Sequence, residues 1–511
     1  MRKLFLVAAL MGTISLAAQE TYENAKLVGD DLNGTARYVG MGGAMEALGA
    51  DLSTIGSNPA GLGLFRHSTA SLSGSLVIQS GVPGYASGDK TRASFDQAGF
   101  VYALKTGDNS FLNFGVNYHK SKNFSFILAA ADGLNNASQN KLSYQKARYG
   151  VTPNHDERFN QVDYLYRNTD LYDPQNDVLY NEVSDGYCLN REHKGYIADY
   201  DFNISGNIND RVYLGMTFGV KDVNYKHYST YKEYGTHDIA LYDDREIEGT
   251  GFNIKAGVIA RPFENSPFRV GLYVHTPTWY DLETSNRTRL EGLPLNEKAR
   301  TNNIHEFYEY NINTPWVFGF SLGHTVGKQL ALGATYEFAD YGNTKTRIKD
   351  GHYYDGWNSY DETSNDHLMN HHTSATLKGV STLKLGAEYK PVKDLALRVG
   401  YNFVSPKYSK DGFKDGTINS PGSYYSSATD YTNWKAINRF TCGIGYQIKS
   451  FNIDLAYQYS AQKGDFYPFM SYYETEPDET GVIDHTQDNI ATAKAVKNNR
   501  SQVMLTIGYH F

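Results

Sequence analysis

A two-residue alternation of apolar and polar side chains runs through most of this 511-residue chain. At the C-terminus one set of positions holds Val503, Leu505, Ile507, Tyr509 and Phe511, and the other holds Gln502, Met504, Thr506, Gly508 and His510. Successive side chains of a β-strand point to opposite faces, so this segment is a strand with one apolar face. The pattern recurs in segments 212–220, 316–322, 330–338, 395–403 and 451–459. The chain is therefore predicted to be all-β.

The amino-acid composition excludes several other classes of protein for this chain. The mean hydropathy of −0.52 is too polar for a bundle of membrane-spanning helices, and the chain has no later run of eighteen apolar residues. A net charge of −8 and a pI near 6.0 argue against a nucleic-acid binder. Two cysteines exclude a disulfide scaffold.

The first 18 residues have the pattern of a secretory signal. A basic start at Arg2 and Lys3 precedes an uncharged apolar run from Leu4 to Ala17, and small residues follow at the end of that run. The run is too short for a spanning helix. The exported chain is therefore expected to be either water-soluble or embedded in a membrane without helices.

The alternation fits either a soluble sandwich or a membrane barrel, and loop lengths favour the barrel. Fourteen strands are predicted, starting near residues 68, 94, 111, 194, 211, 248, 268, 309, 329, 375, 394, 436, 451 and 498. Short connections alternate with long ones such as 124–193, 351–370, 410–433 and 465–497, as in barrels inserted from one side. Aromatic residues lie at the ends of the apolar faces, where a membrane–water interface favours them. The prediction is a 14-stranded antiparallel transmembrane β-barrel whose first and last strands pair.

The segment from residue 19 to about 66 is rich in Gly and Ala and does not alternate. Its polar and small side chains cannot face lipid, so it is expected either in the periplasm or inside the lumen. A barrel of fourteen strands has a bore wide enough to need filling.

This segment carries a resemblance to a known family. Residues 36–44 (ARYVGMGGA), Asp51, and the run Asn58, Pro59, Ala60, Gly61 resemble the hatch of the FadL/TodX outer-membrane transport proteins, in a Bacteroidetes-like branch. Segments 314–316, 383–389 and 397–401 also resemble strands of that family. Tyr509 and Phe511 match the aromatic C-terminal insertion signal of outer-membrane proteins.

The resemblance implies an organisation and a function. Residues 1–18 would be a signal peptide, 19–66 a luminal hatch that plugs the bore, and 67–511 a barrel in the outer membrane of a Gram-negative bacterium. The protein would passively import hydrophobic compounds such as long-chain fatty acids, aromatic hydrocarbons or similar lipids, with lateral or periplasmic release after the hatch moves. Expected partners are that ligand, outer-membrane lipid and lipopolysaccharide, and the barrel assembly machinery. A monomer is expected, with no nucleic acid, no cofactor and no metal.

Three other functions remain open at the level of the sequence. Related proteins serve as outer-membrane docking partners in protein secretion, and the outer loops would then bind protein. A general porin and a haem-uptake protein are further alternatives. No enzyme activity is predicted, because Gly319, Ser321 and Gly323 match a nucleophile-elbow pattern only within one alternating strand.

Four candidate sites have two interpretations each. The Asn58–Gly61 motif is either the family's hatch signature or a turn that ends a Gly-rich loop. Gly115 is either a bulge that opens the wall as a lateral gate or a glycine that fits beside the hatch. The outer loop 124–193, with its many tyrosines, is either a capture site for apolar ligand or a protective cap. His367, His371 and His372 with Asp366 are either metal ligands or solvated loop residues.

Overall fold

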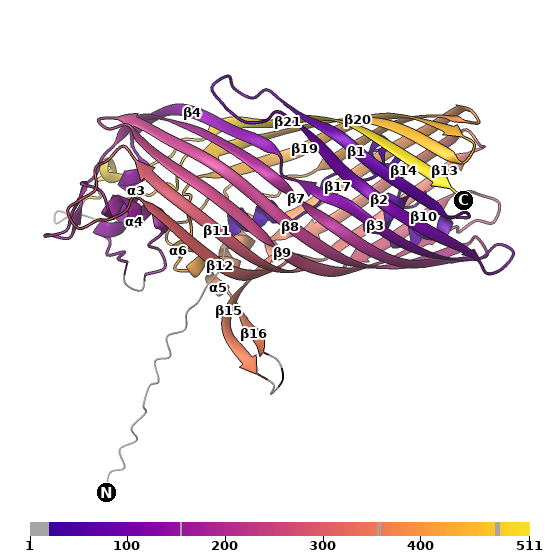
Figure 1. Cartoon of the computed structure of the whole chain (residues 1–511), viewed down its shortest axis with the longest axis horizontal. Coiled ribbons are helices and arrows are strands. Elements are labelled where there is room, and N and C mark those ends of the chain that lie inside the picture. The colour runs from indigo at the N-terminus through magenta and orange to yellow at the C-terminus, as the bar shows by residue number, and fades with distance from the viewer. Residues whose placement is uncertain (1–19, 154–155, 355–356, 358, 476–480) are drawn as a thin grey trace, which may run out of the picture.

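A computed structural model describes residues 20–511 except 154–155, 355–356, 358 and 476–480, so the predicted signal peptide lies outside the described residues. The described strands form one antiparallel sheet that closes into a barrel (Figure 1). Closure joins the two ends of the chain, because β1 (Thr69–Ser80) pairs with β21 (Lys494–His510) from Thr69 and His510 onward. The predicted pairing of first and last strands is confirmed.

The described wall has fourteen strand positions, as predicted. Nine positions are filled by single strands: β1, β2 (Thr91–Lys105), β7 (Ser184–Ile208), β8 (Val212–Gly235), β9 (Ile239–Ala260), β18 (Leu395–Val404), β19 (Tyr431–Ile448), β20 (Phe451–Tyr467) and β21. Five are filled by two strands in succession: β3 (Phe111–Asn123) with β4 (Phe126–Ala137), β10 (Arg269–His275) with β11 (Trp279–Glu291), β12 (Asn303–Asn313) with β13 (Val317–Val326), β14 (Leu330–Asp340) with β15 (Lys345–Tyr354), and β16 (Ser359–Asn365) with β17 (Gly379–Val392).

Proline explains two of the breaks between successive strands. Pro277 lies between β10 and β11, and Pro315 lies between β12 and β13. Proline has no backbone N–H to donate to a neighbouring strand, so the hydrogen-bond ladder is interrupted at both positions. At the first break the position keeps the same neighbours on both sides. β10 and β11 both pair with β9, and on the other side they pair with β13 and β12, the two strands of the next position.

The remaining elements are short helices and one small hairpin. The described N-terminal segment contains α1 (Thr21–Leu27), α2 (Ala36–Gly40), η1 (Leu52–Gly56) and η2 (Pro59–Leu64). Outside the barrel wall lie α3 (Gln139–Arg148), α4 (Gln161–Arg167), β5 (Tyr172–Asp173), β6 (Val178–Leu179), η3 (Tyr341–Asn343), α5 (His367–Thr376), α6 (Pro421–Tyr424) and η4 (His485–Gln487). No described helix is both long enough and apolar enough to span a bilayer.

The two faces of the wall divide as the alternation predicts. Leu455 and Leu505 point outward and are 45% and 46% exposed, whereas their neighbours Asp454 and Thr506 are buried in the lumen. Such an outward apolar face suits hydrocarbon, and the polar inward face suits a filled or wet lumen.

The wall differs from the prediction at its outer end. Segment 124–193 is not one loop, because it contains β4 and the first ten residues of β7. Strands β7, β8 and β9 have 25, 24 and 22 residues, far more than the roughly 10 that cross a bilayer. Where a strand extends beyond the hydrocarbon core of the membrane, both of its faces can be polar. The alternation of apolar and polar residues by which strands were predicted is therefore absent from those parts.

The predicted loop 351–370 also contains regular structure. It supplies part of the hairpin β15–β16, which leaves the wall and points away from it (Figure 1), and the beginning of α5. The hairpin is anchored at its base, where Lys349 of β15 forms ion pairs with Asp281 and Glu309 of the wall.

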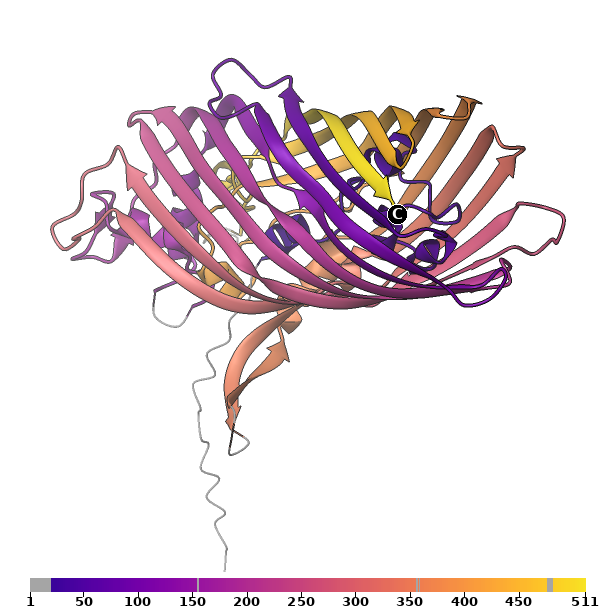
Figure 2. The same cartoon turned by 45° about the vertical axis from the view of Figure 1, so that its right-hand side comes forward.

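The N-terminal segment, here called the hatch (residues 20–65), lies inside the lumen (Figure 2). This resolves the choice between lumen and periplasm. Inward-facing glycines of the wall let the hatch backbone approach closely. A Cβ on Gly215 would lie 2.4 Å from the Pro59 carbonyl carbon, and one on Gly400 would lie 2.2 Å from the Gly42 nitrogen. Comparable close contacts occur at Gly257, Gly323, Gly333 and Gly386.

Candidate ligand cavity above the hatch

The hatch motif forms one turn that fixes the lower hatch to the wall. The side chain of Asn58 caps η2 by accepting a hydrogen bond from the Ala60 N–H, and Pro59 occupies the first turn, where its missing N–H is harmless. Asn58 is fully buried against Gly257 and Gly271 of β9 and β10. Gly61 lies against Thr54, with room for no side chain. The motif therefore acts as a packing element between hatch and wall.

A cavity of about 330 Å³ lies above the hatch in the outer half of the lumen. Its walls are the hatch from Tyr22 to Asn33, the inner faces of the barrel strands, and residues 404–408 and 430–439. Aromatic rings line its upper part: Tyr22 stacks on Tyr408 at 5.2 Å and meets Tyr431 at 5.0 Å between ring centroids. The cavity thus offers an apolar surface next to polar walls.

The lining has more positive than negative groups. Ten Lys or Arg residues line the cavity, against five Asp or Glu residues. Eight of the ten form an ion pair with a carboxylate, some of them with carboxylates behind the lining. Among the described residues, Lys122 and Lys407 have no carboxylate within ion-pair distance. Among the ten described cations of the lining, they are the two without an ion-pair partner.

Both lysines bind main-chain oxygens of the hatch. The Lys122 ammonium donates to the Val28 and Gly29 carbonyls at 2.8 and 2.9 Å. The Lys407 ammonium donates to the Ala25 and Val28 carbonyls, both at 2.8 Å. The two ammonium groups therefore share the Val28 oxygen, and they tie the upper hatch to β3 and to the loop after β18.

Burial holds the pKa of Lys407 well below the ordinary lysine value, and the nearby Lys122 charge acts in the same direction. The carboxylates of Asp31 and Asp30 oppose the shift without cancelling it. A charged group without a charged partner is costly in such a place. An entering carboxylate, sulfonate or phosphate would form stronger hydrogen bonds with these ammonium groups than neutral carbonyls do.

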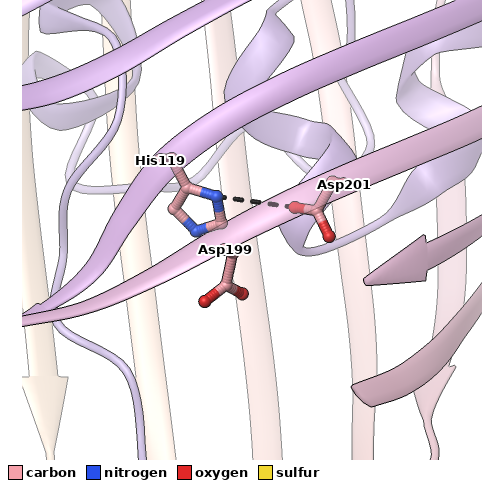
Figure 3. Close-up of side chains that lie close together, drawn as sticks. All are labelled: His119, Asp199 and Asp201. Atoms are coloured by element: carbon pink, nitrogen blue, oxygen red, sulfur yellow. Dashed lines mark ion pairs between the residues drawn. The ribbon is translucent and has the colours of Figure 1, made fainter. Parts of the chain in front are cut away.

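A second polar cluster lies deeper, where wall and hatch meet. His119, Asp199 and Asp201 bring one ligand atom each to within 4.8 Å of one another, and His119 Nδ1 lies 3.5 Å from Asp201 (Figure 3). Both carboxylates, however, already accept hydrogen bonds from lysines: Asp199 from Lys221 at 2.8 Å, and Asp201 from Lys255 at 3.0 Å. A divalent cation would have to displace two ammonium groups, so the cluster is an ion-pair network rather than a metal centre.

The hatch separates this cavity from a second one of about 350 Å³ at the other end of the lumen. Arg37 of the hatch pairs with Glu388 at 3.1 Å, and Arg398 pairs with both Glu388 and Asp454 at 2.6 Å. These charged residues face the lumen, as the alternation predicted. The bridge links hatch and wall in the lining of the lower cavity.

Gly115 lies where the second interpretation of the sequence puts it, beside the hatch. A Cβ at Gly115 would lie 2.4 Å from Leu62 Cδ2, and the residue pairs in regular register with both neighbouring strands. The expected bulge is therefore not at Gly115. The register of β3 instead shifts between Lys120 and Lys122, where the polar strand end no longer has a partner in β2. A gating role for Gly115 stays a prediction.

The histidines predicted as alternative metal ligands do not form a site among the described residues. His367 and His371 are exposed on α5, Asp366 caps that helix through the Met369 N–H, and His372 lies within hydrogen-bond distance of the hatch residue Thr21.

The outer loop forms a cap (residues 138–183), with Tyr166 buried and Tyr164 exposed. Tyr509 and Phe511 face outward near the barrel end.

Sequence reasoning missed both unpaired lysines. Lys122 follows Lys120 at a strand end, and Lys407 lies in a loop without alternation, so neither position carries a signal. His119 lies on β3 and Asp199 and Asp201 lie on β7, at positions where the strand pattern gives only polarity.

Neither a protein-family model nor a curated protein sequence matches the chain. Solved structures do. A Pseudomonas aeruginosa FadL homologue aligns with a TM-score of 0.51 at 12% identity, covering 94% of this chain and 99% of that one. The Pseudomonas putida toluene transporter TodX and the Ralstonia pickettii toluene transporter TbuX align over the same shares at 12% identity, with TM-scores of 0.48 and 0.47. The fold is that of the FadL homologue: a 14-stranded barrel with an internal N-terminal segment.

Proposed function

We propose that the protein is a passive channel in the bacterial outer membrane that imports apolar molecules with an anionic head group, such as long-chain carboxylates. The observation that carries this proposal is the pair Lys122 and Lys407, whose charges no described carboxylate neutralises. The aromatic rings above them supply the apolar part of the site.

The charge pattern favours an anion over a neutral hydrocarbon. A neutral ligand would leave both ammonium groups as they are and gain only apolar contact. An anion gains charge-assisted hydrogen bonds in a site of low polarity. The cavity volume lies at the lower end of the usual range for small-molecule sites, about 300–1,000 Å³.

Binding and hatch movement are linked in this proposal. Lys122 and Lys407 hold the hatch by the carbonyls of residues 25–29, and an anionic head group competes for the same donors. A bound ligand therefore loosens the upper hatch. Release follows either toward the lower cavity or sideways at the register shift near Lys120.

The test is the uptake and binding of laurate by the wild type and by Lys122→Met/Lys407→Met. Each hydrogen bond to a charged group contributes about 1.5–3 kcal/mol, so we expect at least about tenfold weaker laurate binding. Toluene binding should change little. Lys435→Met is the matched control, because Lys435 also lines the cavity but is paired with Asp465 at 2.9 Å. Equal laurate affinity in the double variant and the control would refute the proposal.

A further inference from the structure

Two strand edges in the outer half of the wall have no strand partner among the residues that the structure describes. The register of β12 with β15 covers only Tyr310 to Asn313, because β15 then turns away with β16, so residues 303–309 pair on one side only. On the other side of the break, β18 pairs with β19 only up to Ile437, and residues 431–434 pair only with β20. The wall between β12 and β19 is therefore open as a sheet, and we call this region the window.

Two chain segments fill the window. One is α5, whose Thr373 side chain lies 2.8 Å from that of the hatch residue Thr21, and the other is a side segment. This side segment (residues 405–430) includes α6, and Tyr425 stacks on Tyr308 of β12 with ring centroids 4.7 Å apart. Its buried residues are mostly small and polar: Ser420, Gly422, Ser423, Ser426, Ser427, Ala428 and Thr429. A segment that buries so little apolar surface can leave its place at lower cost than an apolar core element.

The axial mouth of the barrel is closed in a different way. The cap inserts Val162, Leu165 and Tyr166 of α4 into an apolar cluster with the wall. The wall contributes residues of β7–β9 and β11 together with Phe466 of β20 and Val496 of β21. Opening the mouth along the axis would expose this whole cluster to water.

Exposed apolar side chains lie on the elements that border the window. Phe307 of β12 is 58% exposed, Leu368 of α5 57%, and Phe413 of the side segment 55%. The hairpin β15–β16 adds Tyr353, which is also exposed. Exposed apolar groups that gather around one opening mark a contact site for an apolar partner.

We propose that the amphipathic anion enters sideways, from the outer leaflet through the window, by displacing the side segment, and not along the axis through the cap. This inference rests on the proposed function. Phe307, Leu368 and Phe413 would receive the apolar chain outside, and the unpaired lysines would receive the head group inside.

The side segment is tied to the hatch, so its movement reaches the cavity directly. Lys407 holds the Ala25 and Val28 carbonyls, Tyr408 stacks on Tyr22, and Lys414 pairs with Glu20 at 2.7 Å. Displacing the segment frees α1 at its first turn and removes one wall of the cavity. Entry and loosening of the hatch are then one event.

Two matched crosslinks test the route. Both free cysteines are first removed as Cys188→Ser and Cys442→Ser. The window lock is Tyr308→Cys/Tyr425→Cys, closed with a short thiol crosslinker that a reductant cleaves. The cap lock is Thr169→Cys/Leu295→Cys, two residues that face each other in an isolated antiparallel bridge between the cap and the loop that joins β11 to β12. Laurate uptake is measured in cells with each lock closed and after its reductive opening.

We expect the closed window lock to reduce laurate uptake at least tenfold and the closed cap lock to leave it within twofold of the opened form. Uptake through a closed window lock, or loss of uptake with the cap lock closed, would overturn the lateral route while leaving the proposed function intact. Absence of uptake in both opened forms and the wild type would refute the proposed function, and the route with it.

Discussion

At the scale of single residues, the feature that decides the ligand class is an imbalance of charge. The protein pairs most of its buried cations, as in Lys221 with Asp199 and Arg398 with Glu388. It leaves Lys122 and Lys407 with backbone carbonyls only. A buried charge is retained against its desolvation cost where a ligand or a fold requires it.

Ligand binding should depend on pH through Lys407. Its pKa is held below the ordinary lysine value of about 10.4, so the free site loses its charge at lower pH than an ordinary lysine does. Because an anionic ligand needs the charged form, laurate affinity should fall as pH rises through that lowered pKa. Titration calorimetry at a series of pH values on both sides of neutrality would follow this fall.

Lys407→Arg provides the control for the pH effect, because arginine stays charged at alkaline pH. Its laurate affinity should fall less steeply than the wild-type affinity over the same pH range, because one of the two lysine charges has been replaced by a permanent one. A wild-type profile that matches the arginine variant would exclude Lys407 as the titrating group.

At the scale of elements, the inward glycines connect wall and hatch. Gly400 of β18 approaches backbone atoms of Gly42 and Met41, which cannot rotate away as a side chain can. Gly508 of β21 also faces inward, but a Cβ there would have its nearest neighbour at 3.6 Å. The first glycine is required by the hatch and the second is not.

Gly400→Ala should therefore displace the hatch, at a cost of about 1–3 kcal/mol for overpacking. Single-channel conductance in planar bilayers should rise above the wild-type level, because the displaced hatch no longer blocks the lumen. Gly508→Ala should conduct like the wild type. Equal conductance in the two variants would show that the hatch does not depend on this contact.

The same elements show what a sequence can predict. Strands such as β20 and β21 can be predicted from the sequence because lipid requires apolar side chains on one face and the lumen accepts polar ones on the other. The same contrast between the two faces allows the strands to be counted. The outer halves of β7–β9 and the hairpin β15–β16 lie beyond that contrast. Lys407 lies in a loop whose position depends on the packing of the next residue, Tyr408, against Tyr22 of the hatch. No local sequence pattern predicts such a long-range contact, so the sequence could not identify Lys407.

At the scale of the whole molecule, the described part of the barrel has a cavity on each side of the hatch, and the Arg37–Glu388–Arg398–Asp454 bridge lies in the lining of the lower one. The upper cavity combines stacked aromatic rings with two lysines that lack a described ion-pair partner. An apolar anion captured there would remain bound until the hatch moves, so some of it should survive purification.

Mass spectrometry of small molecules extracted from the detergent-purified protein tests this account most directly. The account predicts an apolar anion bound to the wild type, retained by Lys435→Met and lost from Lys122→Met/Lys407→Met. Recovery of only neutral compounds, or of the same anions from all three proteins, would contradict it.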